Sequence, residues 1–208
     1  SALDATQVGA LTTTQTKALT ATQLTGLDAA DVAEFSTTHI SNFANTQLLA
    51  LTSTNMAALS ETQIAAISAP GVKALTATNF AAFAETQLGA LTTTQVSSLT
   101  NTQLQALNST KFASFTATQL GALTTSQVSG ISTTNLSALD ATQFDAFRTT
   151  QLQTLSTTQL NGLSTTDISE LTTTQIGLLT TAQVRGLSTT NIGALSDTQV
   201  LALTTTQL

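Results

Sequence analysis

The residues best suited to metal chemistry gather near the start of the chain, where Asp28, Asp31 and Glu34 follow one another at helical spacing and His39 comes soon after. Carboxylate oxygens and imidazole nitrogens are common ligands of divalent cations. His39 is the one histidine of the chain, so neither a multi-histidine centre nor a histidine-based triad can be built. We expect instead that Asp28 caps a helix, that Asp31 and His39 occupy a second capping position, and that Glu34 is solvated. The sequence therefore predicts no metal site.

Nucleophilic catalysis lacks the arrangement that it needs. Ser and Thr abound, but the sequence contains neither a Gly-x-Ser-x-Gly elbow nor a glycine-rich phosphate loop. The chain also has no Cys, which removes thiolate nucleophiles, thiolate metal ligands and disulfides. We therefore expect no catalytic residues, no cofactor and no enzymatic activity.

The whole chain is built from one unit of eight residues. Leu3 and Leu11 begin a series of large apolar residues, spaced eight apart, that runs without a gap to Leu203; it comprises 26 copies of roughly Leu-Thr-x-Thr-Gln-Val-x-Ala. Such a fixed period indicates a solenoid, whose units bury their apolar sides only against neighbouring units. The sequence predicts a single continuous solenoid over residues 1–208, as a segment of a longer array or as a filament subunit. We number the positions of the octad from zero, at the Leu, to seven.

Positions one and four predict the start of a helix. Position one is Thr, Ser, Asp or Asn in 23 of the 26 octads, and position four is Gln in 17. Thr/Ser-x-x-Gln is a capping box, in which each side chain accepts a hydrogen bond from the other residue's backbone N–H. Position five is apolar in every octad except the one with Thr16, and it shares a helix face with the next position zero. We therefore predict an all-α solenoid with one short capped helix per octad.

A β-solenoid is the alternative, because Thr, Val and Ile favour strands and Thr-x-Thr recurs at positions one and three. The apolar spacings alternate between five and three residues, however, and would put successive apolar side chains on opposite faces of a strand. Position one also accepts Asp and Asn, which favour caps over strands. A helix only ~9 Å long is not stable by itself and must be held by stacking. We expect two octads per coil, with four as the second choice.

Three pairs of Phe recur at intervals of four octads. One interpretation is duplication of a four-octad block; the other is that the pairs stack in register along the solenoid. The pairs are Phe80 and Phe83, Phe112 and Phe115, and Phe144 and Phe147.

Position three is the one candidate functional surface, since it is Thr in 22 of the 26 octads. The structural interpretation is that this Thr completes the first turn and hydrogen-bonds between coils. The functional interpretation is a flat array of hydroxyl and methyl groups, represented by Thr94, Thr102, Thr110 and Thr118, that binds ice or polysaccharide.

The composition excludes further classes of partner. Charged residues make up only 8% of the chain, with a net charge of −6, whereas ordinary soluble domains contain about 25%. No basic run could follow a phosphate backbone, so we expect no nucleic-acid partner. No apolar stretch approaches the length of a membrane span. The sequence opens without a signal peptide, so a secreted form would be a mature or excised segment.

Leu-Thr-Thr-Thr-Gln-Val at Leu91–Val96 and Leu-Ser-Thr-Thr-Gln-Leu at Leu155–Leu160 resemble octapeptide arrays of very large secreted bacterial surface proteins, which are adhesin-like or haemagglutinin-like. The resemblance is one of period and composition, extends over the whole chain and brings no catalytic residues. It implies an extracellular or cell-surface spacer, stalk or self-assembling filament subunit. The implied partners are adjoining repeats or copies of the chain itself, joined head to tail.

Overall fold

The computed structural model describes residues 5–208, and this part of the chain is all-α, with 25 helices of four to six residues and no strand. One helix falls in each of the first 25 octads, which confirms the predicted solenoid of short helices and is incompatible with the β-solenoid. The chain divides into two compact units, Ser1–Ala106 and Leu107–Leu208, which we describe separately. That a single continuous solenoid spans residues 1–208 therefore remains a prediction.

The helices of the first unit are α1 (Ala5–Gly9), α2 (Thr13–Ala18), α3 (Ala21–Thr25), α4 (Ala29–Ala33), α5 (Thr37–Ser41), α6 (Asn45–Ala50), α7 (Ser53–Ala58), α8 (Glu61–Ala66), α9 (Ala69–Ala74), α10 (Ala77–Ala81), α11 (Glu85–Gly89), α12 (Thr93–Ser98) and α13 (Asn101–Gln105). Those of the second unit are α14 (Ser109–Phe112), α15 (Ala117–Ala122), α16 (Thr125–Ser129), α17 (Thr133–Leu136), α18 (Ala141–Asp145), α19 (Thr149–Leu152), α20 (Thr157–Asn161), α21 (Thr165–Glu170), α22 (Thr173–Leu178), α23 (Thr181–Arg185), α24 (Thr189–Gly193) and α25 (Asp197–Leu201).

From α2 onward each helix begins directly after position one of its octad, as predicted, although the side chains of Ala44, Ala84 and Arg148 at that position make no cap bond. At α12, Thr92 Oγ1 accepts the Gln95 N–H at 3.2 Å, and the Thr92 N–H donates to Gln95 Oε1 at 2.7 Å. The helix ends where the Leu99 N–H donates to the Val96 carbonyl at 3.2 Å, after which the chain is extended up to the next cap. Pro70 lies in the first turn of α9, where its missing N–H removes no helical hydrogen bond.

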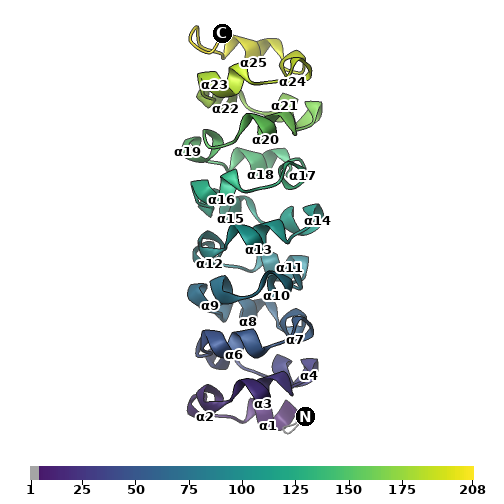
Figure 1. The fold of residues 1–208 in the computed structure, drawn as a ribbon, viewed down its shortest axis with the longest axis vertical. Coiled ribbons are helices and arrows are strands. Elements are labelled where there is room, and N and C mark those ends of the chain that lie inside the picture. Colours follow the sequence, from purple (N-terminus) through teal and green to yellow (C-terminus); the bar gives the residue numbers. More distant parts are fainter. Residues whose placement is uncertain (1–4) are drawn as a thin grey trace. The chain divides into compact units, whose positions relative to one another are not determined.

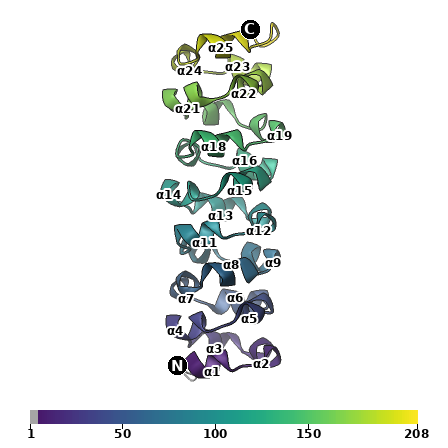
Figure 2. The ribbon, with the colours of Figure 1, turned by 180° about the vertical axis from the view of Figure 1, so that it is seen from behind.

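Three octads make one coil. In the first unit α4 packs on α7 and α7 on α10; in the second, α14 packs on α17 and α17 on α20. Figures 1 and 2 show α4 beside α7, and α21 beside α24, from opposite sides. Helices in contact are thus three octads apart, and our expectation of two or four octads per coil is wrong. The reason is burial: three helices enclose the side chains at positions five and zero, which are buried in most of the described octads.

The core of each unit consists of these two positions. Thr16, the one polar residue at position five, is also fully buried, and its Oγ1 donates to the Thr12 carbonyl at 3.0 Å. Because the longest helices of residues 5–208 have six residues, none of them can cross a membrane.

The phenylalanine rings touch within pairs. In the second unit the ring centroids are 5.6 Å apart in Phe112–Phe115 and 5.3 Å apart in Phe144–Phe147. The interval of four octads exceeds the three-octad coil by one octad, so these two pairs lie in different helix stacks. Stacking of the pairs in register is therefore wrong for this unit, while duplication of a four-octad block remains a prediction.

Candidate functional site: polar bridges between coils and an exposed threonine surface

Position four makes the main polar contact between coils. Gln95 of α12 is buried, and its Oε1 accepts the N–H of its own cap, Thr92. Its Nε2 donates to the carbonyls of Ile64 at 2.9 Å and Ile67 at 2.6 Å, where α8 of the preceding coil ends. One amide therefore caps the start of its own helix and the end of an earlier one.

The same bridge occurs in the second unit. Gln151 of α19 is 0% exposed, and its Nε2 donates to the carbonyls of Leu120 at 3.1 Å and Leu123 at 2.7 Å, where α15 ends. The last carbonyls of a helix have no partner within the helix, and leaving them unpaired in a buried place is unfavourable. Because nearly every carbonyl of such a short helix is terminal, a donor from the next coil stabilises the fold.

Sequence reasoning assigned position four to capping alone and missed this bridge. A signal was present, since position four is Gln in 17 octads and Asn in four, and is never Glu. A capping box accepts Glu as readily as Gln, so the exclusion of Glu indicates that the side chain must also donate. Asn also has an amide donor, although its side chain is shorter by one methylene. Asn55 Nδ2 donates to the Leu27 carbonyl of the preceding coil at 3.1 Å.

Asp167 reverses the direction of the bridge. Its carboxylate accepts the Ser164 N–H at 2.8 Å and the hydroxyl of Ser137 from the preceding coil. A carboxylate cannot donate, so it offers no hydrogen bond to the Leu139 carbonyl, which the Gln pattern would pair. A cavity of about 10 Å³, room for about one water molecule, lies beside Leu139.

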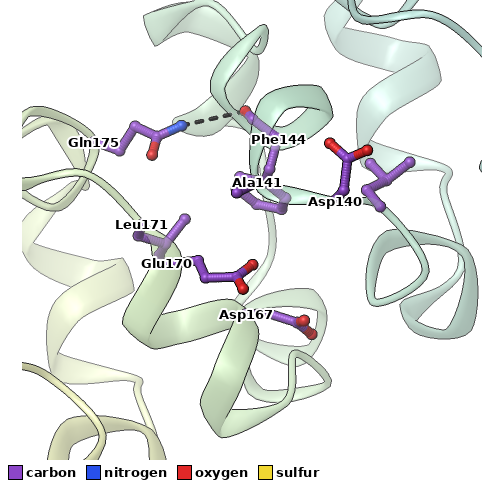
Figure 3. Close-up of a pocket in the computed structure, with 8 residues that line it drawn as sticks. Asp140, Ala141, Phe144, Asp167, Glu170, Leu171 and Gln175 are labelled. Carbon is purple, nitrogen blue, oxygen red and sulfur yellow. Dashed lines mark hydrogen bonds between the residues drawn. The ribbon is translucent and has the colours of Figure 1, made fainter.

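Figure 3 shows this cavity with the carboxylates of Asp140, Asp167 and Glu170 around it, and with the Gln175 Nε2 bonded to the Phe144 carbonyl at 3.2 Å. The Asp140 carboxylate serves as a cap, accepting a backbone N–H of α18. Across residues 5–208, no three histidine, cysteine, aspartate or glutamate side chains are grouped so that they could hold a metal ion.

Of the four residues singled out for metal chemistry, three take the capping roles expected of them and the fourth, Glu34, is solvated as expected. Asp28 Oδ1 accepts the Asp31 N–H at 2.9 Å, and Asp31 Oδ2 accepts the Asp28 N–H at 3.1 Å. His39 Nδ1 accepts the Ser36 N–H at 3.3 Å, in the place of a Gln Oε1. Glu34 is exposed at the end of α4. These assignments are confirmed.

Position three forms the outer surface of the fold, since every residue there from Thr6 to Thr206 is exposed. Where the described residues give this hydroxyl a contact, as where Thr62 Oγ1 lies 3.0 Å from Ser60 Oγ, the partner belongs to the same octad. The Thr hydroxyl is therefore not the bridge between coils that the structural interpretation expected: the side chain at position three is exposed, and position four makes the bridge instead.

The three-octad coil sorts these threonines into separate columns. Thr94 lies in α12, which packs on α9, whereas Thr102 lies in α13, which packs on α10. Thr102 therefore shares a column with Thr78 of α10. In the second unit Thr110 of α14 and Thr118 of α15 also belong to different helix stacks. All four are exposed, but the structure does not group them into one face, and their role remains a prediction.

One column of the second unit carries no charge at positions one to three of its octads. Its helices α14, α17, α20 and α23 pack on one another in that order. We call positions one to three of these octads the hydroxyl column; they read Asn-Ser-Thr, Ser-Thr-Thr, Ser-Thr-Thr and Thr-Thr-Ala. The column consists of residues 108–110, 132–134, 156–158 and 180–182.

The ALTTAQ repeat, as a family model, matches residues 146–181 and 179–208. This match supports the repeat array in the C-terminal part of the chain. A comparison with curated proteins found no match.

Proposed function

We propose that this repeat protein is structural and acts as an extracellular spacer or stalk, or as a self-assembling filament subunit, on a bacterial surface. The observation that carries the proposal is the bridge from position four, made by Gln95 in one unit and Gln151 in the other. Its acceptors are main-chain carbonyls, which every octad offers whatever its side chains. Coils can therefore be added without redesigning the contact between them, as a spacer of adjustable length requires.

A scattering experiment on a tandem fusion tests the spacer. Joining Leu208 to a second Ser1 continues the octad without a slip, because position six follows position five. Small-angle X-ray scattering would compare the chain with its fusion. We expect the radius of gyration to about double for coils stacked in one direction, whereas a compact particle would grow only about 1.3-fold. The smaller growth would overturn the proposal.

Location at the cell surface is the second part of the proposal. It is supported by the resemblance to secreted surface arrays, by the absence of Cys and by the low content of charged residues. Intact cells of the source organism would be treated with a protease and probed with an antibody against residues 1–208. Loss of the signal without lysis is expected; a signal that is lost only after lysis would contradict surface location.

Filament formation would use the last coil. Its position-five residues Ile192, Val200 and Leu208 are 39%, 42% and 74% exposed, whereas the same position is buried in most other coils. An adjoining coil, of a longer chain or of a second copy, would cover them. We expect concentration-dependent assembly by sedimentation velocity, with fibres visible by electron microscopy.

Two variants test that contact. Ile192→Lys with Val200→Lys places charge on the apolar surface and is expected to abolish assembly. The matched control, Thr190→Lys with Thr198→Lys, places the same charges on the outward position three of the same helices and should leave assembly intact. Equal loss in both variants, or no assembly of the parent chain, would exclude this contact as the basis of a filament.

Binding is a second candidate function, favoured by the uncharged hydroxyl column. Its hydroxyls and methyls suit an ordered, neutral ligand such as ice or a polysaccharide. We expect thermal hysteresis or glycan-array binding that Thr134→Lys with Thr158→Lys abolishes. Thr150→Lys with Thr174→Lys, at the same octad position in another helix stack, is the control. Absence of both activities from the parent chain would remove this candidate.

A further inference from the structure

Asn161 connects two successive coils of the second unit by a pair of hydrogen bonds. It is the last residue of α20, and its side chain is exposed. Its Nδ2 donates to the Gly186 carbonyl at 2.8 Å, and its Oδ1 accepts the Ser188 N–H at 2.7 Å. Both amide atoms are thus used, and this contact favours Asn at position 161.

Gly162, the next residue, is required for a separate reason. A Cβ at this position would lie 2.5 Å from Thr133 Cγ2 and 2.6 Å from Thr133 Cβ, both in the preceding coil. These distances are far below van der Waals contact, so a larger residue would force the coils apart. Two independent packing demands therefore place Asn directly before Gly, and this is the one Asn-Gly sequence in the chain.

We infer that Asn161–Gly162 is a site of spontaneous deamidation, and that the folded structure slows this reaction. The Gly162 backbone nitrogen attacks the Asn161 Cγ, forming a C–N bond and a five-membered succinimide. The backbone nitrogen loses its proton, the C–Nδ2 bond breaks and ammonia leaves. Water then opens the ring and leaves aspartate or isoaspartate. No oxidant or cofactor is needed, and glycine favours the step because it has no Cβ to obstruct the attack.

The folded structure opposes the attack in two ways. The Gly162 N–H donates to the carbonyls of Thr158 at 3.0 Å and Gln159 at 3.2 Å, so the nucleophile is engaged. The Asn161 carboxamide is held against the next coil by its bonds to Gly186 and Ser188. The reaction therefore requires local opening at the end of α20, and its rate reports how often that opening occurs.

Deamidation would weaken the contact that had suppressed it. A carboxylate at position 161 can still accept the Ser188 N–H, but it has lost the donor to the Gly186 carbonyl and places a negative charge beside that oxygen. The first event is therefore expected to make further opening of this coil easier.

Deamidation of Asn161 can be measured in the full chain, on one proteolytic peptide. Cleavage after Arg148 and Arg185 releases residues 149–185, in which Asn161 is the single Asn. The folded chain, and the same chain in concentrated urea, would be held at mildly alkaline pH. Mass spectrometry with isoaspartate detection would then follow this peptide. We expect deamidation to be at least about tenfold slower in the folded chain. Equal rates, or no deamidation in urea, would overturn the inference.

Two further comparisons separate this chemistry from general instability. The double variant Thr133→Ala with Gly162→Ala removes the close contact while adding a Cβ to the attacking residue. It should deamidate more slowly than the parent in urea; an unchanged rate would contradict attack by the residue 162 nitrogen.

The second comparison measures the stability of the folded chain. Asn161→Asp should lower the urea midpoint of unfolding, whereas Asn45→Asp, in the first turn of α6, should not. Equal midpoint losses would contradict the role of the Asn161 bridge.

Discussion

At the scale of single residues, the structure depends on a side chain that both accepts and donates. Gln151 Oε1 accepts the Arg148 N–H at 2.7 Å although Arg148 makes no side-chain cap bond, so capping at α19 is one-sided. Its Nε2 at the same time donates to the carbonyls of Leu120 and Leu123, at the end of α15. Glu would keep the first role and lose the second, which explains why the sequence avoids it.

Gln151→Ala tests the bridge. Removing the amide leaves the buried carbonyls of Leu120 and Leu123 without this donor, and we expect a loss of about 3 kcal/mol in the free energy of unfolding. Gln23→Ala is the control, because Gln23 occupies the same octad position but is exposed, with bonds to its own cap. That change should cost about 1 kcal/mol or less. Urea titration measures both, and equal losses would show that position four only caps.

At the scale of helices, neighbouring coils match small residues with large ones. Position seven of one octad faces position two of the octad in the preceding coil. Gly162 faces Thr133, and a Cβ at Gly186 would likewise lie 2.3 Å from Thr157 Cγ2. Ala69 is a smaller residue at position two, and position seven of the facing octad is the larger Ser98. Ser98 Oγ donates to the Ala69 carbonyl at 3.1 Å. The packing of one helix on another therefore depends on the sizes of the side chains at these two positions.

A double-mutant cycle checks this fit. Ala is intrinsically better than Gly in a helix, but Gly162→Ala forces a clash with Thr133, and we expect a net destabilisation of about 1–3 kcal/mol. Thr133→Ala in the same chain should recover most of that loss, because the methyl group that causes the clash is gone. The coupling free energy from four urea titrations is the measurement. Additive effects of the two substitutions would refute the contact.

At the scale of the whole molecule, the octad is expected to be the unit of insertion and deletion, although the coil contains three octads. Most octads carry their own cap, core residues and bridge, so a helix can pack on whichever octad comes to lie beneath it. The Phe pairs agree with this, since they recur after four octads, which is not a whole number of three-octad coils.

Deletion of residues 171–178 tests the unit. The octads that follow would pack one octad earlier, where position two is again Thr at Thr149, Thr157 and Thr165. We expect the helical circular dichroism per residue and the cooperativity of thermal unfolding to be retained. Deleting residues 171–174 alone breaks the period and should lose both for the coils that follow. If the eight-residue deletion proved as damaging as the four-residue one, the octad would not be an independent unit.

The sequence by itself determined what depends on local interactions: the period, the short helix in each octad, the apolar positions five and zero, and the solvated Glu34. These follow from hydrogen bonds and side-chain spacings within a few residues. Only the tertiary structure decided how many octads make one coil, that Thr94 and Thr102 lie in separate columns, and that the Gln at position four also donates to the preceding coil. These depend on contacts between octads that lie three or four apart along the chain, and a strict repeat is compatible with several such distances. Burial of the core from three sides selects one of them.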